Sequence, residues 1–137
     1  DILRIEHLSY WPSIVQMDLT QPEFFIHRGN LTGKGGDEWE NHPDYITEAL
    51  RQGFNVEIDV WFKNGELFLG HDTPKYKIDS RFLINNRLWC HAKNEEALEI
   101  MLSLGNHCFW HETDKYTLTS KGYIWCYRSI KLGQTYP

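Results

Sequence analysis

Three features that often decide a protein's class are absent from this sequence: a long apolar run, an excess of basic residues and closely spaced cysteines. No stretch approaches the roughly 20 apolar residues that a membrane-spanning helix requires. The N-terminus has no basic region followed by an apolar run, so the sequence predicts no signal peptide. The formal net charge of −5 at pH 7 argues against a nucleic-acid partner, since such binding needs an excess of Lys and Arg.

The three cysteines, Cys90, Cys108 and Cys126, form an odd set with no Cys-x-x-Cys spacing. An odd number disfavours the disulfide framework of a small secreted protein, and we therefore expect a cytoplasmic chain with reduced thiols. Histidines lie near these cysteines, so a zinc site is one interpretation. We favour the other interpretation, packing of the thiols inside strands, because buried cysteine commonly fills strand cores.

With 137 residues, of which 41% are hydrophobic and 24% charged, the chain is long enough for one globular domain with a core. The first 22 residues fit this domain poorly. A short helix over 1–10 is one interpretation of their beginning, but Pro12 and Pro22 prevent a longer one. We therefore predict an N-terminal appendage over 1–22 and a domain over 23–137.

From residue 24 onward, short apolar runs alternate with amphipathic stretches. Strands are predicted over 24–26, 55–60, 88–92, 108–110 and 123–127. One helix should begin near Pro43 and another after Asn94, and Asn64-Gly65 is typical of a hairpin turn. Strands separated by helices at this spacing indicate an α/β fold with a mostly parallel sheet, while 117–121 is predicted to form at most one helical turn.

The segment Glu57-Ile58-Asp59 places two carboxylates on one predicted strand. Alternate side chains of a strand share a face, so Glu57 and Asp59 should point one way and Ile58 the other. Two carboxylates this close resist burial unless a cation or a basic group compensates them. Mg²⁺ or Ca²⁺ suits such oxygen ligands best, and a solvent-exposed polar face is the structural alternative.

Histidines follow two of the predicted strands. His27-Arg28-Gly29 ends the first strand, and His71-Asp72 follows the hairpin. A histidine can act as a general acid or base near neutral pH, and an adjacent arginine can form paired hydrogen bonds to phosphate oxygens. Taken alone, each histidine is more often structural than catalytic.

Together, His27-Arg28-Gly29, Glu40-Asn41, Glu57-Ile58-Asp59 and His71-Asp72 resemble, in order, the motifs of the glycerophosphodiester phosphodiesterase family and its phospholipase-like relatives. The resemblance covers about residues 23–127. It implies a (β/α)₈ (TIM) barrel with its chemistry at the C-terminal ends of the strands. It also implies roles for single residues: His27 and His71 as the acid/base pair, Glu57 and Asp59 as metal ligands, and Arg28 as a phosphate contact. Glu40 would be a carboxylate that either contacts the metal or hydrogen-bonds to one of its ligands.

Two departures from the family pattern affect these expectations. Where the family's third strand carries an acidic residue and a lysine, this chain has His91-Ala92-Lys93. Lys93 can still contact a phosphate, but His91 replaces the acid, and imidazole suits Zn²⁺ or Mn²⁺ better than Mg²⁺. Mn²⁺ and Zn²⁺ therefore join Mg²⁺ and Ca²⁺ as candidate metals, and His91 joins Glu40 as a further candidate ligand.

The second departure is length, because a TIM barrel typically needs about 250 residues. The sequence predicts a TIM-barrel-related parallel sheet with about five of the eight βα units. We expect the open sheet edges to be covered by a homo-oligomer or a second chain.

These motifs predict a phosphoric diester hydrolase of lipid metabolism. Its expected reaction is metal-assisted hydrolysis or transphosphorylation of a small-molecule phosphodiester such as a glycerophosphodiester. The alternative is a catalytically incomplete module that binds a phosphate ester or a partner chain.

Overall fold

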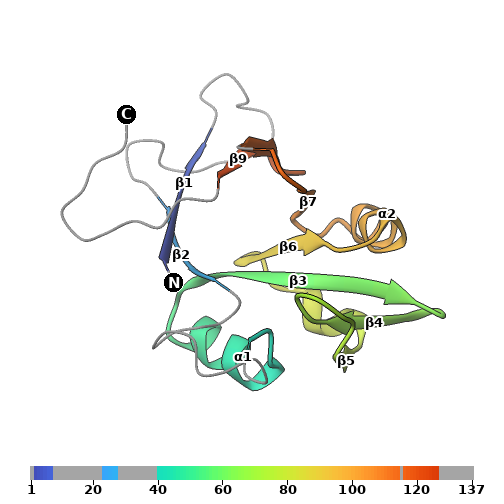
Figure 1. Ribbon diagram of the computed structural model, residues 1–137. Helices are drawn as coiled ribbons and strands as arrows, with labels where there is room; N and C mark the ends of the chain where they lie inside the picture. Colours follow the sequence, from blue (N-terminus) through green and yellow to red (C-terminus); the bar gives the residue numbers. More distant parts are fainter. Residues whose placement is uncertain (1, 8–22, 28–39, 115, 127–137) are drawn as a thin grey trace.

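The computed structural model describes residues 2–7, 23–27, 40–114 and 116–126, with side chains described over 40–114 and 116–125. In chain order (Figure 1), its elements are β1 Ile2–His7, β2 Glu23–His27, α1 Pro43–Arg51, β3 Asn55–Lys63, β4 Glu66–Leu69, β5 Tyr76–Ile78, the 3₁₀ helix Ser80–Leu83, β6 Leu88–Ala92, α2 Glu95–Leu104, β7 Cys108–Trp110, β8 Tyr116–Leu118 and β9 Tyr123–Cys126. The predicted α/β class is therefore confirmed.

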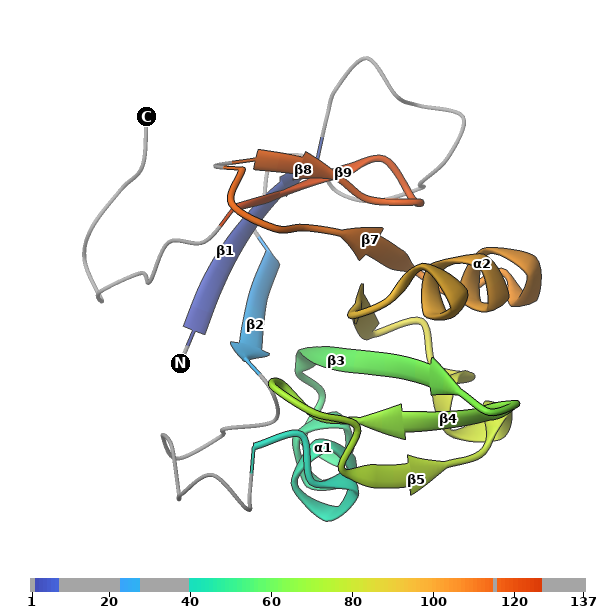
Figure 2. The same cartoon turned by 45° about the vertical axis from the view of Figure 1, so that its right-hand side comes forward.

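The strands form a mixed sheet that is not closed (Figure 2). Strands β2, β3, β6 and β7 are joined by parallel pairing, as the sequence predicts. Antiparallel pairs extend this parallel unit in two directions: β4 and β5 follow the second half of β3, and β1, β9 and β8 continue from β2. The long strand β3 is therefore the centre of the fold, with β6 on one edge and both β2 and β4 on the other.

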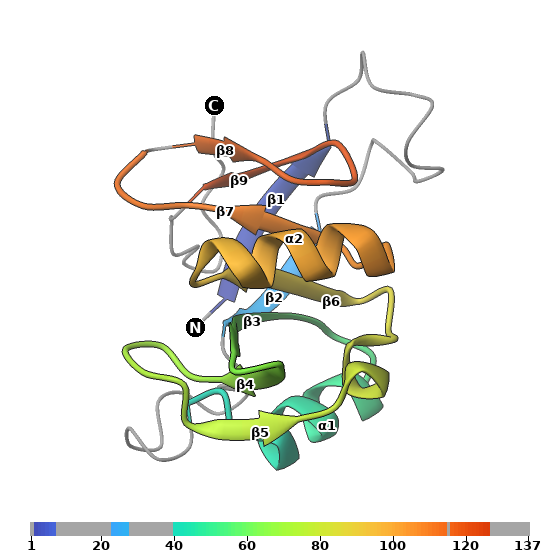
Figure 3. The ribbon, with the colours of Figure 1, turned by 90° about the vertical axis from the view of Figure 1, so that its right-hand side faces the viewer.

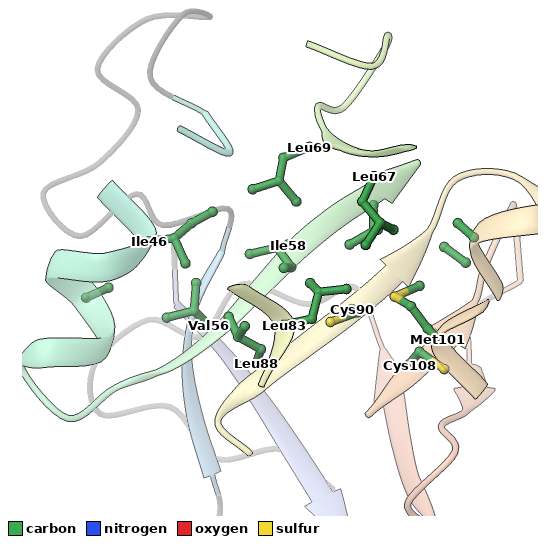
Figure 4. Packing of buried hydrophobic residues seen from close by; sticks show 14 residues of the cluster. Ile46, Val56, Ile58, Leu67, Leu69, Leu83, Leu88, Cys90, Met101 and Cys108 are labelled. Carbon is green, nitrogen blue, oxygen red and sulfur yellow. The ribbon is translucent and has the colours of Figure 1, made fainter. Parts of the chain in front are cut away.

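One face of the parallel strands forms the hydrophobic core (Figure 4). Val56, Ile58 and Val60 of β3 are fully buried there. Both helices pack against this same face, α1 through Ile46 and Ala49 and α2 through Ala97 and Met101, and α2 is in front of the sheet in Figure 3. Because strand side chains alternate, the opposite face carries Glu57 and Asp59.

The two helices begin and end where the sequence indicates. Pro43 occupies the first turn of α1, and the His42 ring accepts a hydrogen bond from the Asp44 N–H. Asn94 caps α2 by accepting from the Ala97 N–H, and Gly105 ends that helix in the left-handed conformation. These caps fix the length of each crossover between parallel strands.

Three sequence predictions about secondary structure and strand direction are wrong. Residues 2–7 form strand β1, not a helix, and pair antiparallel with β2. Strand β9, the fifth predicted strand, runs antiparallel beside β1 instead of parallel to β7. Residues 116–118 form strand β8 against β9, not a helical turn. Cross-strand pairing decides all three, and the proposed boundary at residue 22 stays a prediction.

In the described part of the chain, the two sheet edges that the sequence leaves bare, those of β2 and β7, have hydrogen-bonding partners, and the sheet ends instead at β5 and β8. Strand β1 covers the outer edge of β2, and β9 lies between β1 and β8. The outer edge of β7 is bonded by Ser120, whose N–H donates to the Cys108 carbonyl and whose hydroxyl accepts from the Cys108 N–H. The hydroxyl of Thr117 donates to the Trp110 carbonyl, which caps the same edge.

Cys90 and Cys108 are buried free thiols within the hydrophobic core, and burial raises the pKa of both. They occupy paired positions on β6 and β7, which agrees with the predicted packing role. The side chain of Cys126 lies outside the described residues. Among the described helices, none is long and apolar enough to cross a membrane.

The side chain of His107 contacts both Thr119, in the turn after β8, and Trp89 of β6. Its Nε2 lies 2.7 Å from the Thr119 hydroxyl, and its ring packs 4.0 Å from Trp89. Burial, with a smaller contribution from the Lys121 charge, lowers the pKa of His107 from 6.5 to about 3. The folded chain therefore favours the neutral ring, whereas the unfolded chain protonates it below its ordinary pKa.

We predict an acid-dependent loss of stability from this residue. Because the folded pKa is lowered, the contribution of His107 is complete above about pH 6.5 and decreases as the pH falls toward about 3. Urea unfolding of the wild type and of His107→Gln, followed over pH 7.5 to 4, measures the effect. The variant should show the shallower decline, because it lacks the titrating ring, and equal slopes would contradict the prediction.

Candidate metal centre

Parallel pairing aligns the predicted site residues in two rows across neighbouring strands. The first row pairs His27 of β2 with Glu57 of β3, and Glu57 with Trp89 of β6. The second row pairs Asp59 of β3 with His91 of β6. Residues paired in this way lie next to each other on the same face of a sheet. The register therefore brings the carboxylates of β3 together with His91, and it places the backbone of residue 27 beside them.

Glu57, Asp59 and His91 form a compact buried group. Glu57 and Asp59 are fully buried, and His91 is only 5% exposed. The His91 Nδ1 lies 3.1 Å from Asp59 Oδ1 and 3.9 Å from Glu57 Oε2, and one ligand atom from each residue lies within 4.8 Å of the other two. Two buried carboxylates require a compensating positive charge. A divalent cation held by these atoms would supply it, so the donor set fits the metal site predicted from the sequence.

The ring of His91 is fixed from two sides. Its Nε2 lies 2.9 Å from the carbonyl oxygen of His111, and because a carbonyl only accepts, Nε2 must carry the proton. In the neutral ring, the lone pair of Nδ1 would therefore be available to a cation held by the two carboxylates. The ring of Phe109 stacks on the imidazole at 5.2 Å with an angle of 7° between the planes. A backbone carbonyl on the far nitrogen is the usual arrangement of a metal-binding histidine.

The side chain of Asn41 forms hydrogen bonds with both the backbone and the side chain of Asp59. Strand β2 pairs with β3 up to Glu57 and β4 pairs from Val60, so Asp59 lies between the two on that edge. The amide of Asn41 fills the gap: Oδ1 accepts from the Asp59 N–H at 2.9 Å, and Nδ2 donates to Asp59 Oδ2 at 2.9 Å. Asn41 is fully buried and adopts a positive φ of 62°. These two hydrogen bonds from the same Asn41 side chain fix the direction of the Asp59 carboxylate.

Replacing Asn41 by Ala should destabilise the fold by more than the same change at Asn64. Asn41→Ala leaves the buried Asp59 N–H without its acceptor, which costs about 1–3 kcal/mol. Asn64 also has a positive φ, 53°, but is exposed in the hairpin turn, so Asn64→Ala reproduces the backbone strain without this loss. Urea unfolding of both variants measures the difference, and equal destabilisation would show that the Asn41 hydrogen bonds contribute nothing.

His71 lies at the end of the hairpin, next to the backbone of Asp59. The Gly70 N–H donates to the Asp59 carbonyl at 3.2 Å, and Trp61 Nε1 donates to the Gly70 carbonyl at 2.7 Å. A side chain at Gly70 would meet the Thr73 carbonyl at 1.9 Å, so the turn requires glycine. The His71 Nδ1 lies 2.9 Å from the carboxylate of Asp72, so the acid/base role that the sequence predicts for His71 would use Nε2.

The other predicted residues have varied positions. Lys93 is half-buried directly after β6, and its N–H donates to the Val60 carbonyl, so its backbone lies near the same end of β3. Glu40 is half-buried and does not belong to the group formed by Glu57, Asp59 and His91. Arg28 and the side chain of His27 lie outside the described residues, and their predicted roles stay predictions.

Sequence reasoning missed three contributors to this centre. The side chain of Asn41 and the carbonyl of His111 orient the predicted ligands Asp59 and His91, and Phe109 holds the His91 ring. Asn41 carried the clearest signal, since it directly follows Glu40 in a motif that the family resemblance singles out. A backbone carbonyl and a stacked phenyl ring carry no signal of their own in a sequence.

Comparisons with family models, with curated proteins and with solved structures found no match to this chain.

Proposed function

We propose that this chain carries a metal-assisted phosphodiesterase centre at Glu57, Asp59 and His91. The observation that carries the proposal is the pair of fully buried carboxylates facing the Nδ1 of a histidine whose other nitrogen is bonded to a carbonyl. This arrangement suits a divalent cation. The order of the His27, Glu57, Asp59 and His71 motifs, which resembles the glycerophosphodiester phosphodiesterases, supports phosphodiester chemistry.

In the proposed reaction, His27 removes a proton from the nucleophile, which is either water or a hydroxyl of the substrate itself. His71, oriented by Asp72, protonates the departing alkoxide oxygen. Arg28 and Lys93 hold the non-bridging phosphate oxygens. A bound cation would neutralise the charge that develops on the phosphoryl group. Substrates would be glycerophosphodiesters or lysophospholipid-like diesters.

The alternative function is binding of a phosphate ester without turnover. It is favoured by the open sheet, since the barrel-related architecture that we propose for the parallel strands lacks closure. The burial of Glu57 and Asp59 on β3 opposes this alternative. Burying two carboxylates costs free energy, and their negative charges would repel an anionic ester if no cation were bound.

Hydrolysis of bis(4-nitrophenyl) phosphate separates the two functions. We expect release of nitrophenolate when the wild type is supplied with a divalent cation and none when a chelator is present. Glu57→Gln should be inactive, and Glu66→Gln, a change at an exposed position on β4, should be active. Saturable binding of a phosphate ester with no release of nitrophenolate under any metal would favour the non-catalytic alternative.

Two further proposals concern the surroundings of the protein. We propose a cytoplasmic location, because Cys90 and Cys108 are free thiols. A homo-oligomer is also proposed, and several large apolar side chains are exposed for such a contact: Ile84, Leu102, Leu104 and Tyr116. Light scattering at micromolar concentration tests the oligomer.

A further inference from the structure

We propose that the Glu57–Asp59–His91 centre selects a Zn²⁺-like transition-metal dication over Mg²⁺ and Ca²⁺. The inference rests on the proposed function only in assuming that the centre binds a cation. Three features of the described residues carry it: a nitrogen ligand fixed in place, a carboxylate with one oxygen bonded to Asn41, and a set of ligands that combines two carboxylates with one imidazole.

The nitrogen ligand is the first feature. Imidazole favours Zn²⁺ and its neighbours in the first transition row, whereas Mg²⁺ and Ca²⁺ favour oxygen ligands. His91 cannot easily turn away, because the His111 carbonyl bonds its Nε2 and Phe109 stacks on its face. Trp125 in turn stacks on Phe109 at 4.8 Å, which holds the phenyl ring in place. A cation between Glu57 and Asp59 therefore meets nitrogen on its third side.

The second feature is the hydrogen bond from Asn41 to the Asp59 carboxylate. The Asn41 Nδ2 donates to Asp59 Oδ2 at 2.9 Å, while Asp59 Oδ1 lies 3.1 Å from the His91 Nδ1. Asp59 therefore faces the His91 Nδ1 with Oδ1, and a cation bound through both oxygens would compete with the Asn41 hydrogen bond to Oδ2. Ca²⁺ takes six to eight oxygens and often binds a carboxylate through both, so this arrangement disfavours it.

The third feature is the set of ligands. The group consists of two carboxylates and one imidazole within the described residues. Three protein ligands with a fourth position left for water or substrate are typical of catalytic zinc sites. Mg²⁺ is commonly bound by one or two carboxylates and several waters, so Glu57 and Asp59 alone would suit it, and it is the imidazole of His91 that disfavours it. The fixed imidazole thus favours a transition-metal dication over both alkaline-earth ions, and the Asn41 hydrogen bond to Asp59 further disfavours Ca²⁺.

Calorimetric titration of wild type and His91→Asp with Zn²⁺, Mg²⁺ and Ca²⁺ tests the inference. The wild type should bind Zn²⁺ at least about 100-fold more tightly than Mg²⁺, and the ratio of the two affinities should fall at least about 10-fold in His91→Asp, where oxygen replaces nitrogen. The control is Ser103→Asp, which adds a carboxylate at an exposed position of α2, on the helix that packs against the opposite face of the sheet, and it should retain the wild-type ratio. An unchanged ratio in His91→Asp would overturn the inference.

X-ray absorption of the Zn²⁺-loaded wild type gives a second test that needs no variant. We expect the scattering pattern of one imidazole ligand among oxygens, and a shell of oxygens alone would overturn the selectivity argument. Hydrolysis supported equally by Mg²⁺ and Zn²⁺, with equal affinities, would overturn the inference and leave the proposed function intact. Failure of every cation to bind would overturn both.

Discussion

Asp59→Asn should lower metal-dependent phosphodiester hydrolysis by about 10³-fold or more, because it removes the charge of a buried carboxylate that we propose as a metal ligand, while keeping its shape. Loss of the metal's stabilisation of the transition state is worth several kcal/mol, and about 4 kcal/mol corresponds to this factor. Asn at this position can still hydrogen-bond to Asn41, so the fold should survive. Steady-state rates at saturating metal, with calorimetric titration of the same samples, measure both losses.

The matched control is Asp44→Asn in the first turn of α1, where the carboxylate is exposed. It should keep wild-type metal affinity and rate. A thermal melt of each variant separates loss of the site from loss of the fold. If Asp59→Asn binds metal as tightly as the wild type and hydrolyses the diester at the same rate, Asp59 is not a ligand.

Replacing either His27 or His71 by Ala should lower kcat by about 10²–10⁴-fold, the usual contribution of a general acid or base. Substrate binding should change much less, since neither ring is assigned to the phosphate. The wild-type rate should follow a bell-shaped pH profile, because one group must be unprotonated and the other protonated, and each variant should lose one limb of the bell.

Steady-state kinetics from pH 5 to 9 measures these limbs. Arg81→Ala is a suitable control, because Arg81 is exposed and pairs only with its neighbour Asp79 among the described contacts. Near wild-type kcat in both histidine variants would remove the acid/base assignment while leaving the metal ligands untouched.

The sequence predicted the central parallel unit well, because its signals are local. The alternation over Val56 to Val60 set which β3 side chains enter the core, and both carboxylates lie on the opposite face as predicted. Pro43, Asn94 and Gly105 marked the helix ends through capping chemistry. The turn at Asn64-Gly65 appeared where its positive φ values require those residue types.

The antiparallel additions could not be predicted in the same way. Strand β1 pairs with β9 across most of the chain, as in the pairing of Glu6 with Ile124, and β8 has only three residues. Burial and cross-strand pairing, rather than local propensity, decide whether such segments form strands. Within the candidate site, the residue types pointed to metal binding, but the orientation of His91 depends on a carbonyl 20 residues away.

The central claim is that one cation at Glu57, Asp59 and His91 makes this chain a phosphodiesterase. The most direct measurement is a metal titration in which bound metal and the rate of diester hydrolysis are determined on the same samples. We predict no hydrolysis by the metal-free protein and a rate that rises in proportion to occupancy up to one ion per chain. Full hydrolysis by the metal-free protein, or one bound ion with no hydrolysis, would contradict the claim.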